Sequence, residues 1–122
     1  MSIRFRSRVQ AKSADAIPKK RRSHTVAVDW AKLLPPLQLR NIRPGDRFRP
    51  LGLRGNKKIG DFLTDRKVPK VFRDEIPLLC DRKGIVWLVG HEISDRVKID
   101  VNTREVFTVG YQVRNKRAAD TV

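Results

Sequence analysis

Apolar residues in this chain never form a long uninterrupted run. The longest run is 85–89, Ile-Val-Trp-Leu-Val, which fits a short buried strand. A membrane-spanning helix needs about 18 or more consecutive apolar residues, so the sequence excludes one. Because 39% of the 122 residues are hydrophobic, the chain can nevertheless form one modest core. These limits predict a small soluble domain built from short helices and strands.

Strands are predicted where apolar and polar residues alternate between breaks in the pattern. The segments with this pattern are 25–30, 37–40, 48–51 and 105–113. A hairpin is predicted at 78–80 and 85–89, because the turn between them ends in Gly84, which can adopt a positive φ. The segment 94–98 is compatible with one helical turn.

Two short helices are predicted in the middle of the chain. The first covers 57–66, where Lys57 and Asp61 stand four residues apart and can support a helix as an ion pair. The second begins at Pro69 and ends at Pro77. Its apolar side is expected to contain Val71 or Phe72 and Ile76. The expected fold class is α+β, a small single domain of strands with two short central helices.

The positive charge is concentrated in two blocks. The net charge is +15; residues 1–22 hold eight basic and one acidic side chain, and residues 40–73 hold eleven and three. The stretches 23–39 and 74–122 are each neutral. Two concentrated basic blocks favour a surface that binds a polyanion such as nucleic acid. A generic solvated basic face is the alternative interpretation.

The first basic block has few apolar anchors. We therefore predict a basic flexible arm over 1–22, a folded domain over 23–113 and a frayed tail over 114–122. The alternation of residues 3–9 also fits a short strand. The arginine- and serine-rich composition of the arm also resembles an organellar transit peptide.

Two reactive side chains favour structural over catalytic roles. A single cysteine, Cys80, cannot form an internal disulfide and lies in an apolar segment, so we expect a small buried side chain in a reducing, cytosolic protein. His91 follows Gly90 at the end of a predicted strand and is a candidate general base, although a partly packed histidine is the simpler interpretation. No metal site is expected.

The glycines at 55 and 60 have the spacing of a phosphate-binding loop. Asp61 and Phe62, however, stand where that loop requires a lysine and a serine or threonine. The simpler interpretation is a loop that links a strand to a helix. Carboxylates in or beside the basic block could also form a metal or acid pair, but buttressing ion pairs with arginine are the simpler expectation.

The second basic block has features of nucleic-acid contact beyond its charge. Four of its arginines fall close together, and arginine makes paired hydrogen bonds to phosphate. They are Arg40, Arg43, Arg47 and Arg49. Phe48, Phe62 and Phe72 are predicted to face the core, so contact with the backbone of a duplex-like RNA is favoured over base stacking. DNA remains the alternative polyanion.

Two motifs in this block are specific. The sequence R-P-G-D-R-F at 43–48 is followed by K-K-x-x-D-F-x-x-D-x-K-V-P at 57–69. Together with 39–52, 73–78, 85–90 and 95–98, they closely resemble the C-terminal domain of tRNA(Ile)-lysidine synthetase over about residues 25–110. The resemblance implies an α+β domain similar to one in the phenylalanyl-tRNA synthetase β subunit.

The resemblance also implies a function. The parent family is an ATP-dependent ligase that joins lysine to the wobble cytidine of an isoleucine tRNA, with ATP and Mg as its cofactors. Its catalytic domain carries an S-G-G-x-D-S loop that these 122 residues lack. We therefore expect a tRNA-binding accessory domain that is no enzyme on its own, needs no cofactor and engages the acceptor-stem side of the tRNA in the cytoplasm.

The motif implies tRNA contacts for seven basic residues, which are Arg40, Arg43, Arg47, Lys57, Lys58, Arg66 and Lys67. The carboxylates implied to orient them are Asp46, Asp61 and Asp65. A separately encoded catalytic domain is a further implied partner. The alternatives are a free-standing protein that binds structured RNA nonspecifically and a protein that binds anionic membranes through 1–22.

Overall fold

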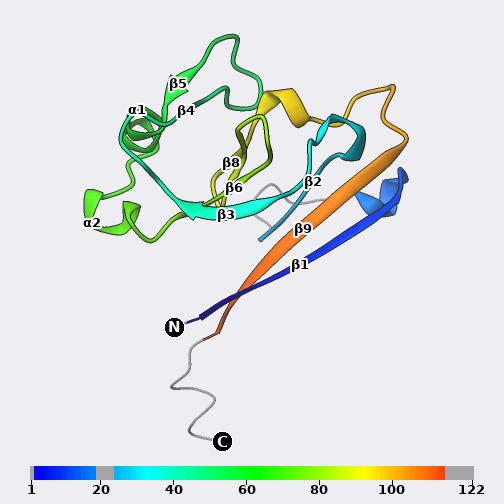
Figure 1. The fold of residues 1–122 in the computed structure, drawn as a ribbon, viewed down its shortest axis with the longest axis horizontal. Helices are drawn as coiled ribbons and strands as arrows, with labels where there is room; N and C mark the ends of the chain where they lie inside the picture. Colours follow the sequence, from blue (N-terminus) through cyan, green and yellow to red (C-terminus); the bar gives the residue numbers. More distant parts are fainter. Residues whose placement is uncertain (1, 19–23, 115–122) are drawn as a thin grey trace, which may run out of the picture. The chain divides into compact units, whose positions relative to one another are not determined.

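The computed structural model describes residues 2–18 and 24–114 and divides into two compact units (Figure 1). Unit 1 comprises Met1–Ala31 with Ile99–Val122, and unit 2 comprises Lys32–Lys98. The basic run 19–22 and the tail predicted at 114–122, except Arg114, lie outside the described residues. The prediction of a small α+β domain with two short helices is confirmed.

Unit 1 contains a three-stranded antiparallel sheet in the order β1-β9-β2. Its strands are β1 (Ser2–Ala11), β2 (Thr25–Asp29) and β9 (Glu105–Arg114). A short 3-10 helix, η1 (Ala14–Ala16), follows β1, and another, η2 (Trp30–Lys32), follows β2. The strands predicted at 25–30 and 105–113 are therefore present.

The prediction of a flexible arm was wrong for residues 2–11. This segment is paired with β9 over its full length, from Ser2 opposite Arg114 to Ala11 opposite Glu105 (Figure 1). The pairing satisfies backbone hydrogen bonds, a contribution that the charge of the side chains does not reveal. The boundary predicted at residue 22 therefore does not separate the first strand from the rest of its unit.

Unit 2 contains a four-stranded sheet in the order β3-β6-β7-β8 and a two-stranded sheet, β4-β5. The strands are β3 (Gln38–Asn41), β4 (Arg47–Phe48), β5 (Lys57–Lys58), β6 (Pro77–Cys80), β7 (Ile85–Leu88) and β8 (Glu92–Ile93). Its helices are α1 (Ile59–Asp65), α2 (Lys70–Arg73) and the 3-10 helix η3 (Asp95–Val97). The predicted hairpin and helical turn are confirmed.

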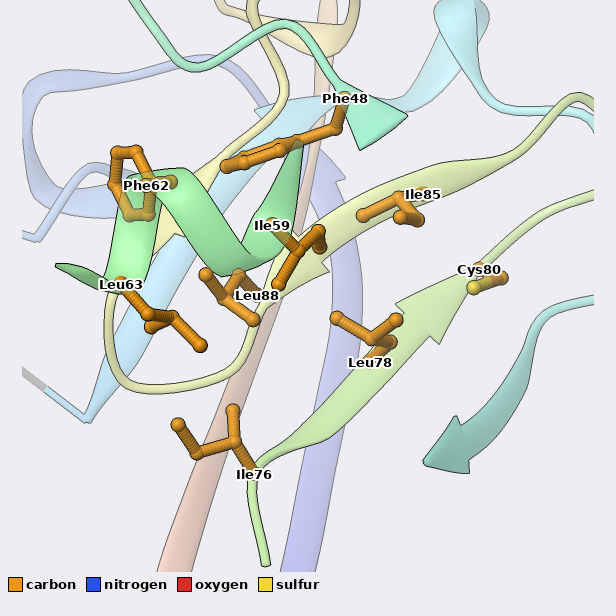
Figure 2. Packing of buried hydrophobic residues seen from close by; sticks show 9 residues of the cluster. All are labelled: Phe48, Ile59, Phe62, Leu63, Ile76, Leu78, Cys80, Ile85 and Leu88. Carbon is orange, nitrogen blue, oxygen red and sulfur yellow. The ribbon is translucent and has the colours of Figure 1, made fainter. Parts of the chain in front are cut away.

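The core of unit 2 lies between α1 and the inner strands of the four-stranded sheet (Figure 2). The helix buries its apolar residues at helical spacing, and β6 and β7 contribute Leu78 and Leu88, which are fully buried. Phe48 of β4 meets Phe62 of α1 edge to face, with ring centroids 5.3 Å apart. Cys80 is buried in this cluster, as predicted.

Both helices are shorter than predicted. Residues 57 and 58 form β5 instead of the first turn of α1, because they pair with β4. The predicted pair between Lys57 and Asp61 is therefore absent. Helix α2 has a single turn, and its Val71 and Phe72 are 76% and 57% exposed, so Phe72 does not face the core.

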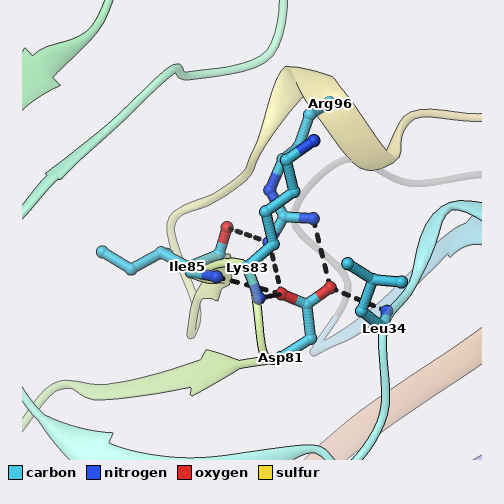
Figure 3. Close-up of polar contacts among 6 residues, drawn as sticks. Leu34, Asp81, Lys83, Ile85 and Arg96 are labelled. Atoms are coloured by element: carbon cyan, nitrogen blue, oxygen red, sulfur yellow. Dashed lines mark hydrogen bonds and ion pairs between the residues drawn. The ribbon is translucent and has the colours of Figure 1, made fainter.

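The β6–β7 hairpin is held by the carboxylate of Asp81 (Figure 3). The carboxylate accepts hydrogen bonds of 2.7 and 3.1 Å from the guanidinium of Arg96. It also accepts backbone N–H groups of Leu34, Lys83 and Gly84. Gly84 has a φ of +145°, as the turn requires. One buried carboxylate thus connects three segments of unit 2.

Candidate nucleic-acid interface

Arg40 and Arg43 are tied to one carboxylate. The guanidinium of Arg40 donates to the two oxygens of Asp46 at 2.8 and 2.9 Å, and the backbone N–H of Arg43 donates to the same carboxylate at 2.7 Å. The hydrogen bond from Arg40 is the main reason that the pKa of Asp46 is lowered. Asp46 therefore stays charged at neutral pH and fixes the turn that presents both arginines.

Arg47 and Lys58 lie opposite each other in the β4–β5 ladder. Phe48 points into the core, so the residues on either side of it, Arg47 and Arg49, are directed away from the core. In the part of the chain that the structure describes, neither Arg47 nor Lys58 makes a side-chain hydrogen bond or ion pair. Their Cβ atoms are held about 5 Å apart by the ladder, which makes a local concentration of positive charge.

Arg49 is fixed by an aspartate that the sequence did not single out. Asp95 is buried, accepts the N–H of Gly52 at 2.9 Å and lies 3.3 Å from the guanidinium of Arg49. The hydrogen bond from Gly52 is the main reason that the pKa of Asp95 is lowered. Arg49 is one of the four arginines that the sequence singled out for nucleic-acid contact, but its partner Asp95 lies far along the chain and no sequence pattern pointed to it.

The remaining predicted residues lie around the end of α1. Lys57 forms an ion pair with Asp65. The guanidinium of Arg66 lies 4.7 Å from the ring centre of Phe62 and 3.4 Å from Glu92. Lys67 ends the helix with a φ of +59°. These three residues form a second group, and β5 joins it to Arg47, because Lys57 and Lys58 pair with Phe48 and Arg47 of β4.

The three predicted orienting carboxylates differ in their contacts. Asp46 holds Arg40, and Asp65 pairs with Lys57. Asp61 makes no side-chain hydrogen bond or ion pair among the described residues. Five of the seven predicted basic residues are exposed, and these are Arg43, Arg47, Lys58, Arg66 and Lys67. Arg40 and Lys57 are partly buried.

The segment from Gly55 to Gly60 does not fit a nucleotide phosphate. Residues 57 and 58 form a strand, the backbone N–H of Ile59 donates to the carbonyl of Asp46 at 3.0 Å, and Phe62 is in the core. These backbone and side-chain groups, which a phosphate loop would need for its ligand, thus make contacts within the domain.

The side chain of His91 is partly buried and makes no hydrogen bond or ion pair with an acidic residue in the described part of the chain. Burial, and secondarily the charge of Arg66, lowers the pKa of His91, so its imidazole is neutral at pH 7. Residues 2–18 and 24–114 contain no cluster of three His, Cys, Asp or Glu that could hold a metal ion. No helix among them has the length and apolar character of a membrane span.

The fold and this surface define a small α+β domain with arginine and lysine displayed on a turn, a strand pair and a helix end. Residues 37–109, more than half of the chain, match the family model described as "TilS substrate C-terminal domain". The chain therefore belongs to the TilS substrate C-terminal domain family.

Two relatives are enzymes named tRNA(Ile)-lysidine synthase. The protein of Caldanaerobacter subterraneus subsp. tengcongensis is 42% identical over 83 residues, which are 68% of this chain and 18% of the relative. That of Clostridium tetani is 40% identical over 81 residues, which are 66% of this chain and 17% of the relative. The chain thus spans less than a fifth of the length of these relatives.

Solved structures extend the likeness to the fold. The crystal structure of a TilS C-terminal domain superposes with a TM-score of 0.74 and 27% identity, covering 93% of this chain and 86% of that one. An N-terminal fragment of the phenylalanyl-tRNA synthetase β-subunit from Pyrococcus horikoshii gives a TM-score of 0.65 at 21% identity, covering 77% of this chain and 30% of that one. The second likeness is one of fold, and it agrees with the resemblance that the sequence predicted.

Proposed function

We propose that this chain is a tRNA-binding accessory domain of a tRNA(Ile)-lysidine synthetase. It would hold an isoleucine tRNA on the acceptor-stem side while a catalytic domain, joined to it or separately encoded, modifies the wobble cytidine. A tRNA-binding role would place the chain in the cytoplasm. The family membership supports this assignment of substrate, and the basic surface of unit 2 supports the mode of binding.

The opposition of Arg47 and Lys58 carries the proposal. Two like charges directly across a strand pair destabilise a fold, and here they lack a neutralising side-chain partner in the described part of the chain. A bound phosphate would relieve this repulsion and release counterions from the nucleic acid. The opposed charges of Arg47 and Lys58 therefore favour the state in which a phosphate is bound.

The proposed contacts differ in the way they are held. Asp46 fixes Arg40 by hydrogen bonds and Asp95 fixes Arg49 by an ion pair, so these arginines would present a preset geometry to the RNA. Arg47, Lys58 and Lys67 are not held in this way among the described residues and would adapt to phosphate positions. Recognition by the shape and charge of a duplex stem fits this combination, because RNA duplexes are read mainly through backbone contacts.

We further propose that the chain does not carry out the ligase reaction itself. The S-G-G-x-D-S loop that the family's catalytic domain uses with ATP and Mg does not occur in these residues. Residues 55–60 have hydrogen bonds and packing unsuited to a phosphate loop. The chain's role would be to position the tRNA.

A fluorescence titration tests the proposal. The chain is titrated with isoleucine tRNA, an acceptor-stem minihelix and duplex DNA of equal length, each at several salt concentrations. We expect tRNA and minihelix to bind more tightly than DNA at moderate salt. Equal affinity for all three, lost together as salt rises, would contradict the proposal and favour the alternative of a nonspecific binder of structured RNA.

A further inference from the structure

Strand β1 presents three arginines on one face. Arg4, Arg6 and Arg8 occupy alternate positions, so their side chains share a side of the sheet. In the antiparallel register they lie opposite Gln112, Gly110 and Thr108 of β9. The sequence indicated polyanion binding only for the basic block 1–22 as a whole, and the family model begins only at residue 37.

These residues line a groove of about 530 Å³ in unit 1. Its lining combines the three arginines with neutral polar side chains and contains no carboxylate. The neutral members include Gln10, Thr108 and Gln112. Hydrogen-bond donors and positive charge thus line the same concave surface. That combination suits an anion with several oxygens.

Gly110 lies in the groove at a position that has no room for a side chain. A Cβ atom at this position would lie 2.5 Å from the hydroxyl oxygen of Thr25 and 3.4 Å from the backbone oxygen of His24, so no side chain fits there without displacement. Beside it, the hydroxyl of Thr108 is buried and has no hydrogen-bond partner among the described residues. The side chain of Thr25 thus occupies the space above Gly110, and the hydroxyl of Thr108 is a polar group in the groove wall without a partner among the described residues.

The three guanidinium groups are available for binding. They are exposed, and none makes a hydrogen bond or ion pair to another described residue. Alternate residues of a strand are about 7 Å apart, so the row extends over about 14 Å. A row of this length matches a linear polyanion better than a single small anion.

We propose that this face of the β1-β9-β2 sheet binds the sugar-phosphate backbone of an RNA, with each arginine contacting a separate phosphate. The ligand is a nucleic-acid backbone, because three arginines follow one another along a concave groove that also has neutral polar side chains. A membrane surface would instead require apolar anchors on the same face as the charges, whereas the exposed Ile3 and Val9 of β1 stand at the alternate positions and so lie on the opposite face. The inference goes beyond the proposed function, since it concerns another surface and does not depend on recognition of tRNA.

The test uses the full chain and a 20-base-pair RNA duplex of arbitrary sequence. The variant R4Q/R6Q/R8Q removes the row, and R82Q/K83Q/R104Q removes the same charge from exposed residues whose side chains make no hydrogen bond or ion pair to another described residue. A third variant, R4K/R6K/R8K, keeps the charge and loses the paired donors. Thermal unfolding of each variant checks that the sheet is intact.

We expect R4Q/R6Q/R8Q to bind the duplex about ten-fold more weakly than R82Q/K83Q/R104Q and to lower the salt slope by about 3. The lysine variant should fall between the two and keep the slope. Equal affinity and slope for the two glutamine variants would overturn the inference. So would a selective loss of binding to vesicles containing phosphatidylserine with unchanged RNA binding. The preference for tRNA over duplex DNA is measured in a separate titration. If that titration contradicts the proposed function, the comparison of the arginine variants still tests this inference.

Discussion

Arg40 and Asp46 meet through two nearly parallel hydrogen bonds, which place a carboxylate in the middle of a basic turn. Simple electrostatics would make this carboxylate unfavourable for binding RNA. Its hydrogen bonds to Arg40 and to the backbone of Arg43 instead give it a positioning role. The negative charge of Asp46 should weaken RNA binding, whereas its positioning of Arg40 should strengthen it. A mutation of Asp46 can therefore distinguish the two effects.

Asp46→Asn is expected to weaken RNA binding although it makes the chain more positive. Loss of the charged pair leaves Arg40 free to adopt other rotamers, and we expect an affinity for tRNA lower by about five-fold, equivalent to about 1 kcal/mol. Asp61→Asn is the matched control, because it removes the same charge from a residue without a side-chain partner in the described segments. Tighter binding by both variants in a fluorescence titration would show that Asp46 does not position the site.

Asp81→Asn is expected to destabilise the fold without a direct effect on the basic surface. The variant loses the ion pair with Arg96 and leaves that cation partly buried, so the free energy of unfolding should fall by about 3 kcal/mol. Urea denaturation at pH 7 measures the change. A loss below about 0.5 kcal/mol would mean that the Asp81 network contributes little to the hairpin.

The same carboxylate predicts a pH dependence of stability. Burial raises the pKa of Asp81, but hydrogen bonds from Arg96 and from the N–H groups of Leu34 and Lys83 lower it below its usual value overall. An aspartate in the unfolded chain has a pKa of about 3.9. The stabilisation by Asp81 is therefore complete above that pH, and it declines as the pH falls toward the lower pKa of the folded state. Urea denaturation between pH 7 and pH 3 should show a smaller loss for Asp81→Asn than for the parent chain. Parallel curves would contradict this assignment.

Leu63→Ala is expected to cost much more stability than Val71→Ala. Leu63 is 1% exposed within the core around α1, so its truncation should cost about 2–5 kcal/mol. Val71 is 76% exposed on α2, and its truncation should change stability by less than about 0.5 kcal/mol. Thermal unfolding of the two variants compares them directly. Similar losses would show that α2 is packed more closely than its exposure indicates.

Local patterns predicted the elements that depend on neighbouring residues. The hairpin of β6 and β7 follows from two apolar runs around a turn that ends in Gly84. The prediction that Phe62 of α1 faces the core is likewise confirmed. The overall α+β class followed from these elements together with the motif resemblance.

Pairings between distant elements could not be predicted, although the alternation of residues 3–9 did fit the strand that the structure shows. Strand β1 is held by β9 about 100 residues later, and β5 exists because Lys58 finds Arg47 across a loop. The ion pairs of the basic surface could not be predicted for the same reason. Lys57 pairs with Asp65 instead of Asp61, and Arg49 is held by Asp95, which is far away in the sequence.

The most direct test of the central claim is the binding of isoleucine tRNA by the variant R47Q/K58Q, compared with R82Q/K83Q. Both lose two positive charges, but only the first pair is opposed across the β4–β5 ladder. We expect the affinity for isoleucine tRNA to be about ten-fold lower for R47Q/K58Q and the salt slope to be reduced by about 2. The melting temperature of this variant should be unchanged or higher, because the repulsion between Arg47 and Lys58 is removed. Equal affinity and slope for the two variants, with both folded, would contradict the claim that this surface binds the tRNA.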